Sequence, residues 1–184
     1  MCIRDRYKGH RELLAIAPDL VARHPGLRFA LLGDEVEPHL EYAQSLRREV
    51  EELGLGGFVR FLGYRDDAPE LIAGADLVLI PSRPDATGLG REGFSYVGLE
   101  ALTAGTPVVG YAQGGLPEVV GDCGILVQPG NRVALSEAVA ALIDDPDLRD
   151  RLGRCGRERV RERFSLERTV EAMKERYAAA ARTA

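Results

Sequence analysis

Short apolar runs alternate along this chain with segments that have the apolar spacing of helices. The runs have the length of strands and cover residues 28–33, 58–62, 76–81, 107–111 and 124–127. The helical segments cover residues 9–24, 37–53, 66–74, a stretch after Gly93, 117–120, a stretch after Asn131, 146–162 and 166–181. Strands that alternate with helices predict a parallel sheet with helices on both faces, which is a doubly wound α/β fold.

The stretch between the third and fourth runs carries the most chemical information. It contains two glutamates, Glu92 and Glu100, and no other charged residue occurs from Gly93 to Pro117. Apolar residues surround Glu100 in the sequence, so we expect its helix to be largely buried. A buried carboxylate is costly unless a partner donates hydrogen bonds to it, and Glu100 therefore becomes a candidate ligand-binding residue.

The start of that helix is a candidate anion site. Gly93 lets the backbone approach a ligand closely, and the free N–H groups of Phe94, Ser95 and Tyr96 would open the helix. A helix N-terminus attracts phosphate. In doubly wound, Rossmann-like sheets ligands bind at the carboxyl ends of the strands, and this loop follows the third strand.

These residues carry a family resemblance. The pattern Glu-x7-Glu with Gly-Phe after the first Glu, then Glu-Ala-Leu-x-Ala-Gly-Thr-Pro-Val-Val at 100–109 and Gly-Gly-Leu-Pro-Glu-Val-Val at 114–120, resembles the donor-site signature of the retaining glycosyltransferases of family 4. The resemblance covers Tyr7 to about Ala181. It implies the C-terminal half of a two-Rossmann-domain enzyme that moves a hexose from a UDP-, GDP- or ADP-sugar to a glycan, lipid or small-molecule acceptor. It also implies retention of anomeric configuration, with no metal ion and no cofactor.

The resemblance also implies a role for each site residue. Lys8 and the backbone amides of 93–96 would bind the donor diphosphate, and Glu92 would hold hydroxyls of the donor sugar. Lys8 and Glu92 are thus the expected catalytic residues. Glu100 would hold the ribose hydroxyls, and the backbone at Gly63 and Tyr64 would receive the base.

Three departures from the family pattern bear on this expectation. Ser95 replaces a frequent Gly. The link formed by residues 82–91 is longer than usual, and we interpret it either as a lid over the donor or as an inert insertion. The Gly-Arg that family members carry upstream would fall within residues 1–6, where we assign no residue to its role.

Residues 1–6 resemble translated sequencing adapter, so we interpret them as non-native and residues 7–184 as one nucleotide-sugar-binding domain. The domain that would bind the acceptor is then missing, and we expect no sugar transfer by this chain alone. In the family the last helix crosses back to that domain. The apolar stripe of the last segment (Leu166, Val170, Met173 and Tyr177) should therefore be partly exposed.

Composition limits the remaining possibilities. A chain of 184 residues that is 45% hydrophobic suits one domain with a full core, and a net charge of -5 argues against a nucleic-acid partner. Cys2, Cys123 and Cys155 leave an odd count without CxxC spacing, which predicts free thiols in a reducing compartment. The three histidines lack metal-ligand spacing. We expect a cytoplasmic protein, with the inner face of the membrane as an alternative location.

Several other patterns have plainer interpretations. Residues 88–93 fit the dinucleotide fingerprint G-x-G-x-x-G, but no strand ends directly before them and no acid follows at the next strand end. Asp145-Pro146-Asp147 is interpreted as helix capping rather than metal binding. The arginine-rich segment 149–163 is interpreted as a solvated face, with peripheral contact to an anionic membrane as the alternative. The alternative functions are a sugar-nucleotide epimerase of the same build and a non-catalytic nucleotide-binding module.

Overall fold

The strands of this protein pair in parallel, as predicted. The structure, a computed structural model, describes residues 6–33, 40–84 and 93–183. Its strands within these ranges are β1 (Phe29–Leu32), β2 (Val59–Gly63), β3 (Val78–Ile80), β4 (Val108–Tyr111) and β5 (Gly124–Val127). β1 pairs with β2, and β3, β4 and β5 pair in that order, every pair being parallel. The ladders form two sheets, one of β1 and β2 and one of β3, β4 and β5, and the three residues of β3 pair with β4.

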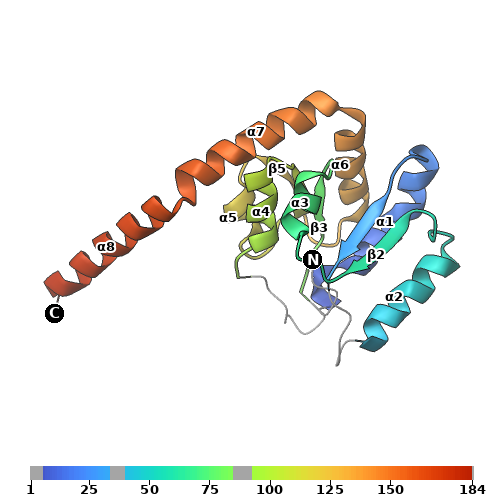
Figure 1. Ribbon diagram of the computed structural model, residues 1–184, viewed down its shortest axis with the longest axis horizontal. Helices are drawn as coiled ribbons and strands as arrows, with labels where there is room; N and C mark the ends of the chain where they lie inside the picture. Colours follow the sequence, from blue (N-terminus) through green and yellow to red (C-terminus); the bar gives the residue numbers. More distant parts are fainter. Residues whose placement is uncertain (1–5, 34–39, 85–92, 184) are drawn as a thin grey trace.

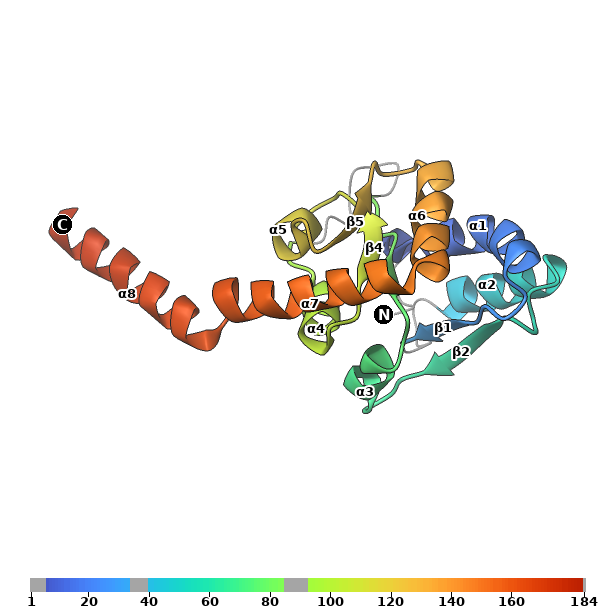
Figure 2. The same ribbon diagram turned by 90° about the horizontal axis from the view of Figure 1, so that it is seen from above.

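Helices cover both faces of the strands (Figures 1 and 2). They are the short 3-10 helix η1 (Arg6–Lys8) and the α-helices α1 (His10–Arg23), α2 (Leu40–Glu52), α3 (Ala68–Ala73), α4 (Tyr96–Ala104), α5 (Leu116–Val120), α6 (Arg132–Asp144), α7 (Pro146–Arg163) and α8 (Leu166–Thr183). α1 packs against α2 and α6, whereas α4 packs against α3, α5 and α7. The fold is therefore doubly wound, as the alternation of elements predicted.

Strand β4 shows how the two faces are built. Its residues are all buried, and they alternate between two clusters. Val109 and Tyr111 pack with α1 and α6, and Val108 packs with α4 and α5. A strand with apolar residues on both faces is typical of a parallel sheet covered on both sides.

Two capping interactions confirm predicted helix starts. The Oδ1 atom of Asn131 accepts a hydrogen bond from the Ala134 N–H at 3.0 Å and begins α6. The Oδ1 atom of Asp145 accepts one from the Leu148 N–H at 2.8 Å and begins α7. The Asp145-Pro146-Asp147 pattern is therefore a cap, as expected.

The arginines of α7 differ from the expected solvated face. Arg157 donates to the carbonyl oxygen of Ala104 at the end of α4, at 2.9 Å from Nη2. Arg159 donates to the carbonyl oxygens of Val119 and Glu118 at the end of α5, at 2.8 and 2.6 Å. The last carbonyls of a helix lack intrahelical partners, so these two side chains stabilise the C-terminal ends of two other helices. The sequence pattern missed this because the carbonyls lie about 40 to 50 residues away.

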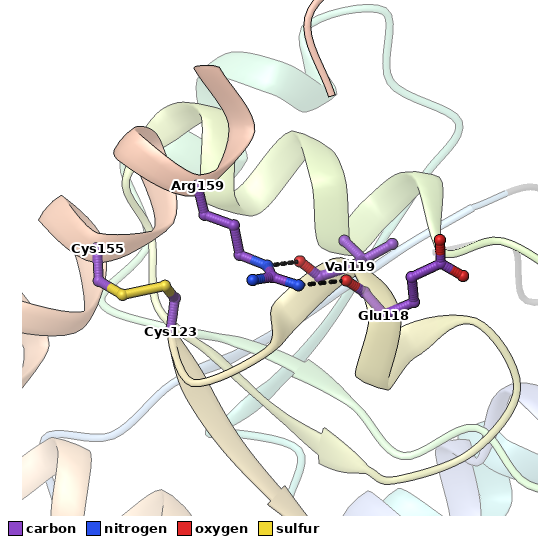
Figure 3. The surroundings of a disulfide bond; sticks show 5 residues. All are labelled: Glu118, Val119, Cys123, Cys155 and Arg159. Atoms are coloured by element: carbon purple, nitrogen blue, oxygen red, sulfur yellow. Dashed lines mark hydrogen bonds between the residues drawn. A yellow bond between two sulfur atoms is a disulfide. The ribbon is translucent and has the colours of Figure 1, made fainter. Parts of the chain in front are cut away.

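Cys123 and Cys155 form a disulfide, so the prediction of three free thiols is wrong (Figure 3). Arg159 holds α7 against α5, which places Cys155 beside Cys123 with 5.2 Å between their Cα atoms. That separation is usual for a disulfide. The pair is 32 residues apart, and nothing in the local sequence marks it.

Helix α8 extends away from the rest of the protein (Figures 1 and 2). The predicted stripe is exposed, with between 40% and 73% of each residue accessible in Leu166, Val170, Met173 and Tyr177. The expectation that part of this stripe lacks cover within the chain is therefore confirmed.

Some expectations fall outside the described residues. They are the interpretation of the first residues as non-native, the lid or inert insertion within residues 85–91, and the role of Glu92. The boundary between residues 1–6 and 7–184 stays a prediction. Among the residues that the structure does describe, no helix has the length and apolarity needed to cross a membrane.

Candidate functional site

Helix α4 begins at Tyr96, two residues later than predicted. Ser95 is fully buried and is its N-cap: the Oγ atom accepts a hydrogen bond from the Gly98 N–H at 3.4 Å. Serine is favoured at this position because its side chain satisfies one of the otherwise unpaired N–H groups of the first turn. The amides left at the helix start are those of Tyr96 and Val97, rather than the full set from Phe94 to Tyr96.

The turn after β4 packs onto the segment before α4. A Cβ atom on Gly115 would collide with the carbonyl oxygen of Gly93 and approach the Cα atom of Phe94, so only glycine fits here. The Phe94 ring contacts the Tyr96 ring edge-on, with 5.2 Å between centroids. The two motifs quoted for the family resemblance, around 92–96 and 114–120, are thus brought together in space.

Gly93 itself has open space around it. No described atom lies within 4 Å of the position that a Cβ atom would take, and the residue is exposed. A ligand could therefore approach the backbone here without displacing any atom of the described residues.

Lys8 lies at the same edge of the sheet. It ends η1 and is followed by Gly9, whose φ of 78° lies in the left-handed region and begins α1. The Tyr7 carbonyl accepts a hydrogen bond from the Arg83 N–H at 2.8 Å, so the backbone beside Lys8 is joined to the segment that leaves β3. The Lys8 Nζ atom lies 5.0 Å from the centroid of the Tyr7 ring.

Glu100 is exposed, and the prediction that it is buried is wrong. The buried residues of α4 are Gly98, Ala101 and Leu102. Each helical residue turns the chain by about 100°, so apolar neighbours in sequence need not share a face with Glu100. An exposed carboxylate can accept hydrogen bonds from a ligand, but its position no longer requires one.

Tyr64 follows the last residue of β2 and is 70% exposed. Gly63 before it has a φ of 67°, and its carbonyl oxygen accepts a hydrogen bond from the Gly33 N–H at 2.8 Å. The ends of β1 and β2 are therefore joined at this edge, with Tyr64 facing solvent beside them.

Sequence reasoning missed a buried carboxylate at Glu12. The residue lies in the first turn of α1 and is only 3% exposed. Its Oε2 atom accepts hydrogen bonds from the Tyr111 hydroxyl at 2.8 Å and from Arg132 Nε at 3.0 Å, and its Oε1 atom accepts one from Arg132 Nη2 at 2.9 Å. The Arg83 Nε atom lies 3.4 Å from Oε1. We call these four residues the Glu12 cluster.

The cluster changes the acidity of its members. Burial by itself would raise the pKa of Glu12, but hydrogen bonds from Arg132 and Tyr111, with the charges of Arg132 and Arg83, hold that pKa below its ordinary value. Burial, followed by the hydrogen bond to Glu12, raises the pKa of Tyr111. Glu12 is therefore ionised and Tyr111 is neutral near neutral pH.

A hollow of about 540 Å³ lies between α5 and the junction of α7 and α8. It is lined by Glu118, Glu162, Arg163, Phe164 and Arg168. None of the predicted site residues that the structure describes lines it. Among the described residues no group of three histidine, cysteine or acidic side chains could hold a metal ion.

Comparison with known proteins places these features in context. Residues 4–159 match the family described as glycosyl transferases group 1. The chain is 34% identical over 163 residues to a GDP-mannose-dependent monoacylated alpha-(1-6)-phosphatidylinositol monomannoside mannosyltransferase of Corynebacterium glutamicum. The matched residues are 87% of this chain and 41% of that protein.

Two solved structures are also similar to this chain. One is sucrose-phosphate synthase from Thermosynechococcus elongatus, with a TM-score of 0.81 and 30% identity over 98% of this chain and 44% of that one. The other is Anabaena HepE in complex with UDP, with a TM-score of 0.85 and 27% identity over 96% of this chain and 46% of that one. The chain thus spans less than half the length of each of these proteins.

Proposed function

Because the chain belongs to the glycosyl transferases group 1, we propose that it is the nucleotide-sugar-binding domain of a glycosyltransferase. The reaction moves a hexose from a nucleotide sugar to a glycan, lipid or small-molecule acceptor. One observation carries the proposal: the turn after β4 packs onto Gly93 and Phe94, so that the start of α4 forms a glycine-lined edge where a ligand can meet backbone amides. Lys8 lies at the same edge.

The diphosphate of the donor binds at the start of α4. The amides of Tyr96 and Val97 and the positive end of the helix dipole favour an anion there, and Lys8 adds a compact positive charge. Negative charge grows on the diphosphate as the bond to the sugar breaks. Fixed donors that bind this charge more strongly in the transition state would lower the barrier.

The remaining roles follow the family resemblance. Glu92 holds hydroxyls of the donor sugar, Glu100 holds the ribose hydroxyls, and the backbone at Tyr64 receives the base. The exposure of Glu100 supports its role, because a ribose can reach the carboxylate. The nucleotide of the donor is UDP, GDP or ADP: HepE is described with UDP, and the Corynebacterium relative is described as GDP-mannose-dependent.

We assign the finer class on the same grounds: family 4, retention of anomeric configuration, and no metal ion. Lys8 and the helix amides supply the positive charge that a divalent cation would otherwise provide. The stereochemistry of the product, measured by NMR during turnover of the complete enzyme, tests the assignment of retention.

The acceptor binds in a second domain that docks on α8. This chain spans 41% of the Corynebacterium relative, and the stripe on α8 has no cover within the described residues. Transfer requires the acceptor to be held against the donor, and positioning accounts for much of an enzyme's rate. We therefore expect no turnover by the 184-residue chain, and robust transfer by the purified chain would contradict this part of the proposal.

We propose a cytoplasmic location, with the inner face of the membrane as the alternative. Contact with anionic lipid would use the exposed arginines of α7, Arg151, Arg154, Arg161 and Arg163, since Arg149, Arg157 and Arg159 donate to backbone carbonyls within the fold. Disulfides are rare in reducing compartments, so the bond between Cys123 and Cys155 argues against this location. Alkylation of the native protein in intact cells decides: labelling of both thiols supports the cytoplasm, and protection of both contradicts it.

Calorimetric titration of this chain with UDP, GDP and ADP tests the donor site. Glu100→Gln removes charge-assisted hydrogen bonds to the ribose and should weaken binding by about tenfold. Lys8→Ala should weaken the binding of a nucleoside diphosphate more than that of the nucleoside. Glu137→Gln on α6 and Lys174→Ala on α8, both exposed, are matched controls that should bind as the wild type does.

Three results would contradict this proposal or parts of it. If none of the three nucleotides binds the wild-type chain, the chain has no donor site and the proposal is wrong. If Glu100→Gln binds as tightly as the wild type, Glu100 has no ribose role. Epimerisation of a nucleotide sugar by the complete protein, without transfer, would favour the epimerase instead.

A further inference from the structure

The Glu12 cluster joins four parts of the fold at the carboxyl edge of the sheet. Glu12 belongs to α1, Arg83 to the segment after β3, Tyr111 to the end of β4 and Arg132 to the first residue of α6. Glu12 is the one acidic side chain that is buried among the described residues. The function proposed above leaves it without a role.

Stability alone does not explain a buried carboxylate of this kind. Removing an ion from water costs several kcal/mol, and apolar side chains of similar volume often replace buried ion pairs without loss. What the cluster provides is geometry, because a bidentate guanidinium and a hydroxyl fix the carboxylate in one orientation. The elements that carry these groups are then fixed relative to one another.

The backbone of Lys8 lies between two anchors, one of which reaches the Glu12 cluster. On one side, the Tyr7 carbonyl accepts a hydrogen bond from the Arg83 N–H, and the Arg83 side chain reaches Glu12. On the other side, Gly9 lies directly against the Pro81 carbonyl, where a Cβ atom would not fit. The Gly9 carbonyl accepts hydrogen bonds from the N–H groups of Glu12 and Leu13. Of these two anchors, the one through Arg83 ends at the Glu12 carboxylate, and the other is a backbone contact of α1, the helix that carries Glu12.

We propose that Glu12 is a positioning residue for the donor diphosphate: it fixes the backbone that carries Lys8 against the ends of β3 and β4. The proposal rests on the diphosphate role of Lys8 given above.

The test is the affinity of the full chain for a nucleoside diphosphate relative to its nucleoside. Glu12→Gln keeps the shape and an acceptor for Tyr111, but removes the charge that holds Arg83 and Arg132. We expect the diphosphate to bind at least about fivefold more weakly, with nucleoside affinity unchanged. A residue needed only for folding would weaken both. Glu137→Gln, at the exposed residue of α6 that was used above, is the matched control and should change neither.

A double-mutant cycle shows whether Glu12 acts through Lys8. If it does, Glu12→Gln adds little to Lys8→Ala, because the side chain that it positions is already absent. Fully additive losses would contradict the proposal. If Glu12→Gln fails to fold, Arg132→Gln, which changes a half-exposed side chain, replaces it in the comparison of diphosphate and nucleoside affinity.

The outcomes separate this inference from the function on which it depends. If the wild-type chain binds no nucleoside diphosphate, the donor site itself is wrong. If the wild type binds, Lys8→Ala weakens binding, and neither Glu12→Gln nor Arg132→Gln alters the preference for the diphosphate, then the donor site stands and the positioning role is refuted.

Discussion

Reduction of the disulfide between Cys123 and Cys155 should lower the stability of this protein by roughly 3–4 kcal/mol. The bond closes a loop with a sequence separation of 32 residues. In the chain-entropy description, a loop of this size loses about 12 cal/mol/K of entropy in the unfolded state, which is about 3.7 kcal/mol at 25 °C. For a chain of this length each kcal/mol corresponds to about 2–4 °C, so the melting temperature should fall by about 7–15 °C.

Thermal unfolding followed by circular dichroism, with and without dithiothreitol, measures this change. Reduction is a cleaner perturbation than mutation because it leaves the two sulfur atoms in place. Cys2→Ser, at the cysteine outside the described residues, is the control, and its melting should respond to the reductant as the wild type does. A count of free thiols in the unfolded, unreduced chain should give one.

Two results would refute this reasoning. Three free thiols in the unreduced chain would mean that the bond does not form. One free thiol together with an unchanged melting temperature would mean that the loop is already constrained in the unfolded state, so that the cross-link adds nothing.

Three further predictions concern the packing and charge of the fold. Gly153→Ala should destabilise the protein by about 1–3 kcal/mol in a denaturant titration, because its Cβ atom would collide with the carbonyl oxygen of Gly105. The lowered pKa of Glu12 stabilises the fold fully above its ordinary value of 4.5 and loses this effect as the pH falls through the folded value. The stability difference between wild type and Glu12→Gln should therefore shrink below about pH 4.5. Deletion of residues 166–184 should leave the melting temperature unchanged, because the stripe on α8 is exposed.

Controls and contrary results for these predictions are equally direct. Gly57→Ala adds a methyl group where no atom lies within 4 Å and should be tolerated. Equal losses for Gly57→Ala and Gly153→Ala would mean that glycine packing between α4 and α7 is not the cause. A constant difference for Glu12→Gln across the acid range would show that the carboxylate does not titrate with folding. A lower melting temperature after deletion would show that α8 supports the domain.

The sequence predicted what depends on neighbouring residues. The apolar runs located all five described strands, and Asn131 and Asp145 were recognised as caps because the cap and its partner amide lie three residues apart. The start of α4 was placed two residues early because Ser95 was treated as a helix residue rather than as its cap. The burial of Glu100 was inferred from neighbours that lie on other faces of the helix.

The parts that escaped prediction depend on distant residues. Glu12 meets Tyr111 and Arg132 across 99 and 120 residues, and no local pattern reports such a meeting. The disulfide follows from α7 lying across α5, which is a property of packing. Among the predicted site residues, Glu92 lies outside the described ranges, and the roles of the others remain predictions.

The exposed arm formed by α8 has a mechanical consequence. Phe164 directly follows the last residue of α7. Its ring lies edge-on to that of Phe94, with 6.0 Å between centroids. Phe94 in turn contacts Tyr96, the first residue of α4. These three rings connect the junction of α7 and α8 to the start of α4, where we propose that the diphosphate binds. A force that displaces α8 would therefore be transmitted to the start of α4 through these aromatic contacts. A partner that binds α8 would then also act on the backbone where we propose that the diphosphate binds.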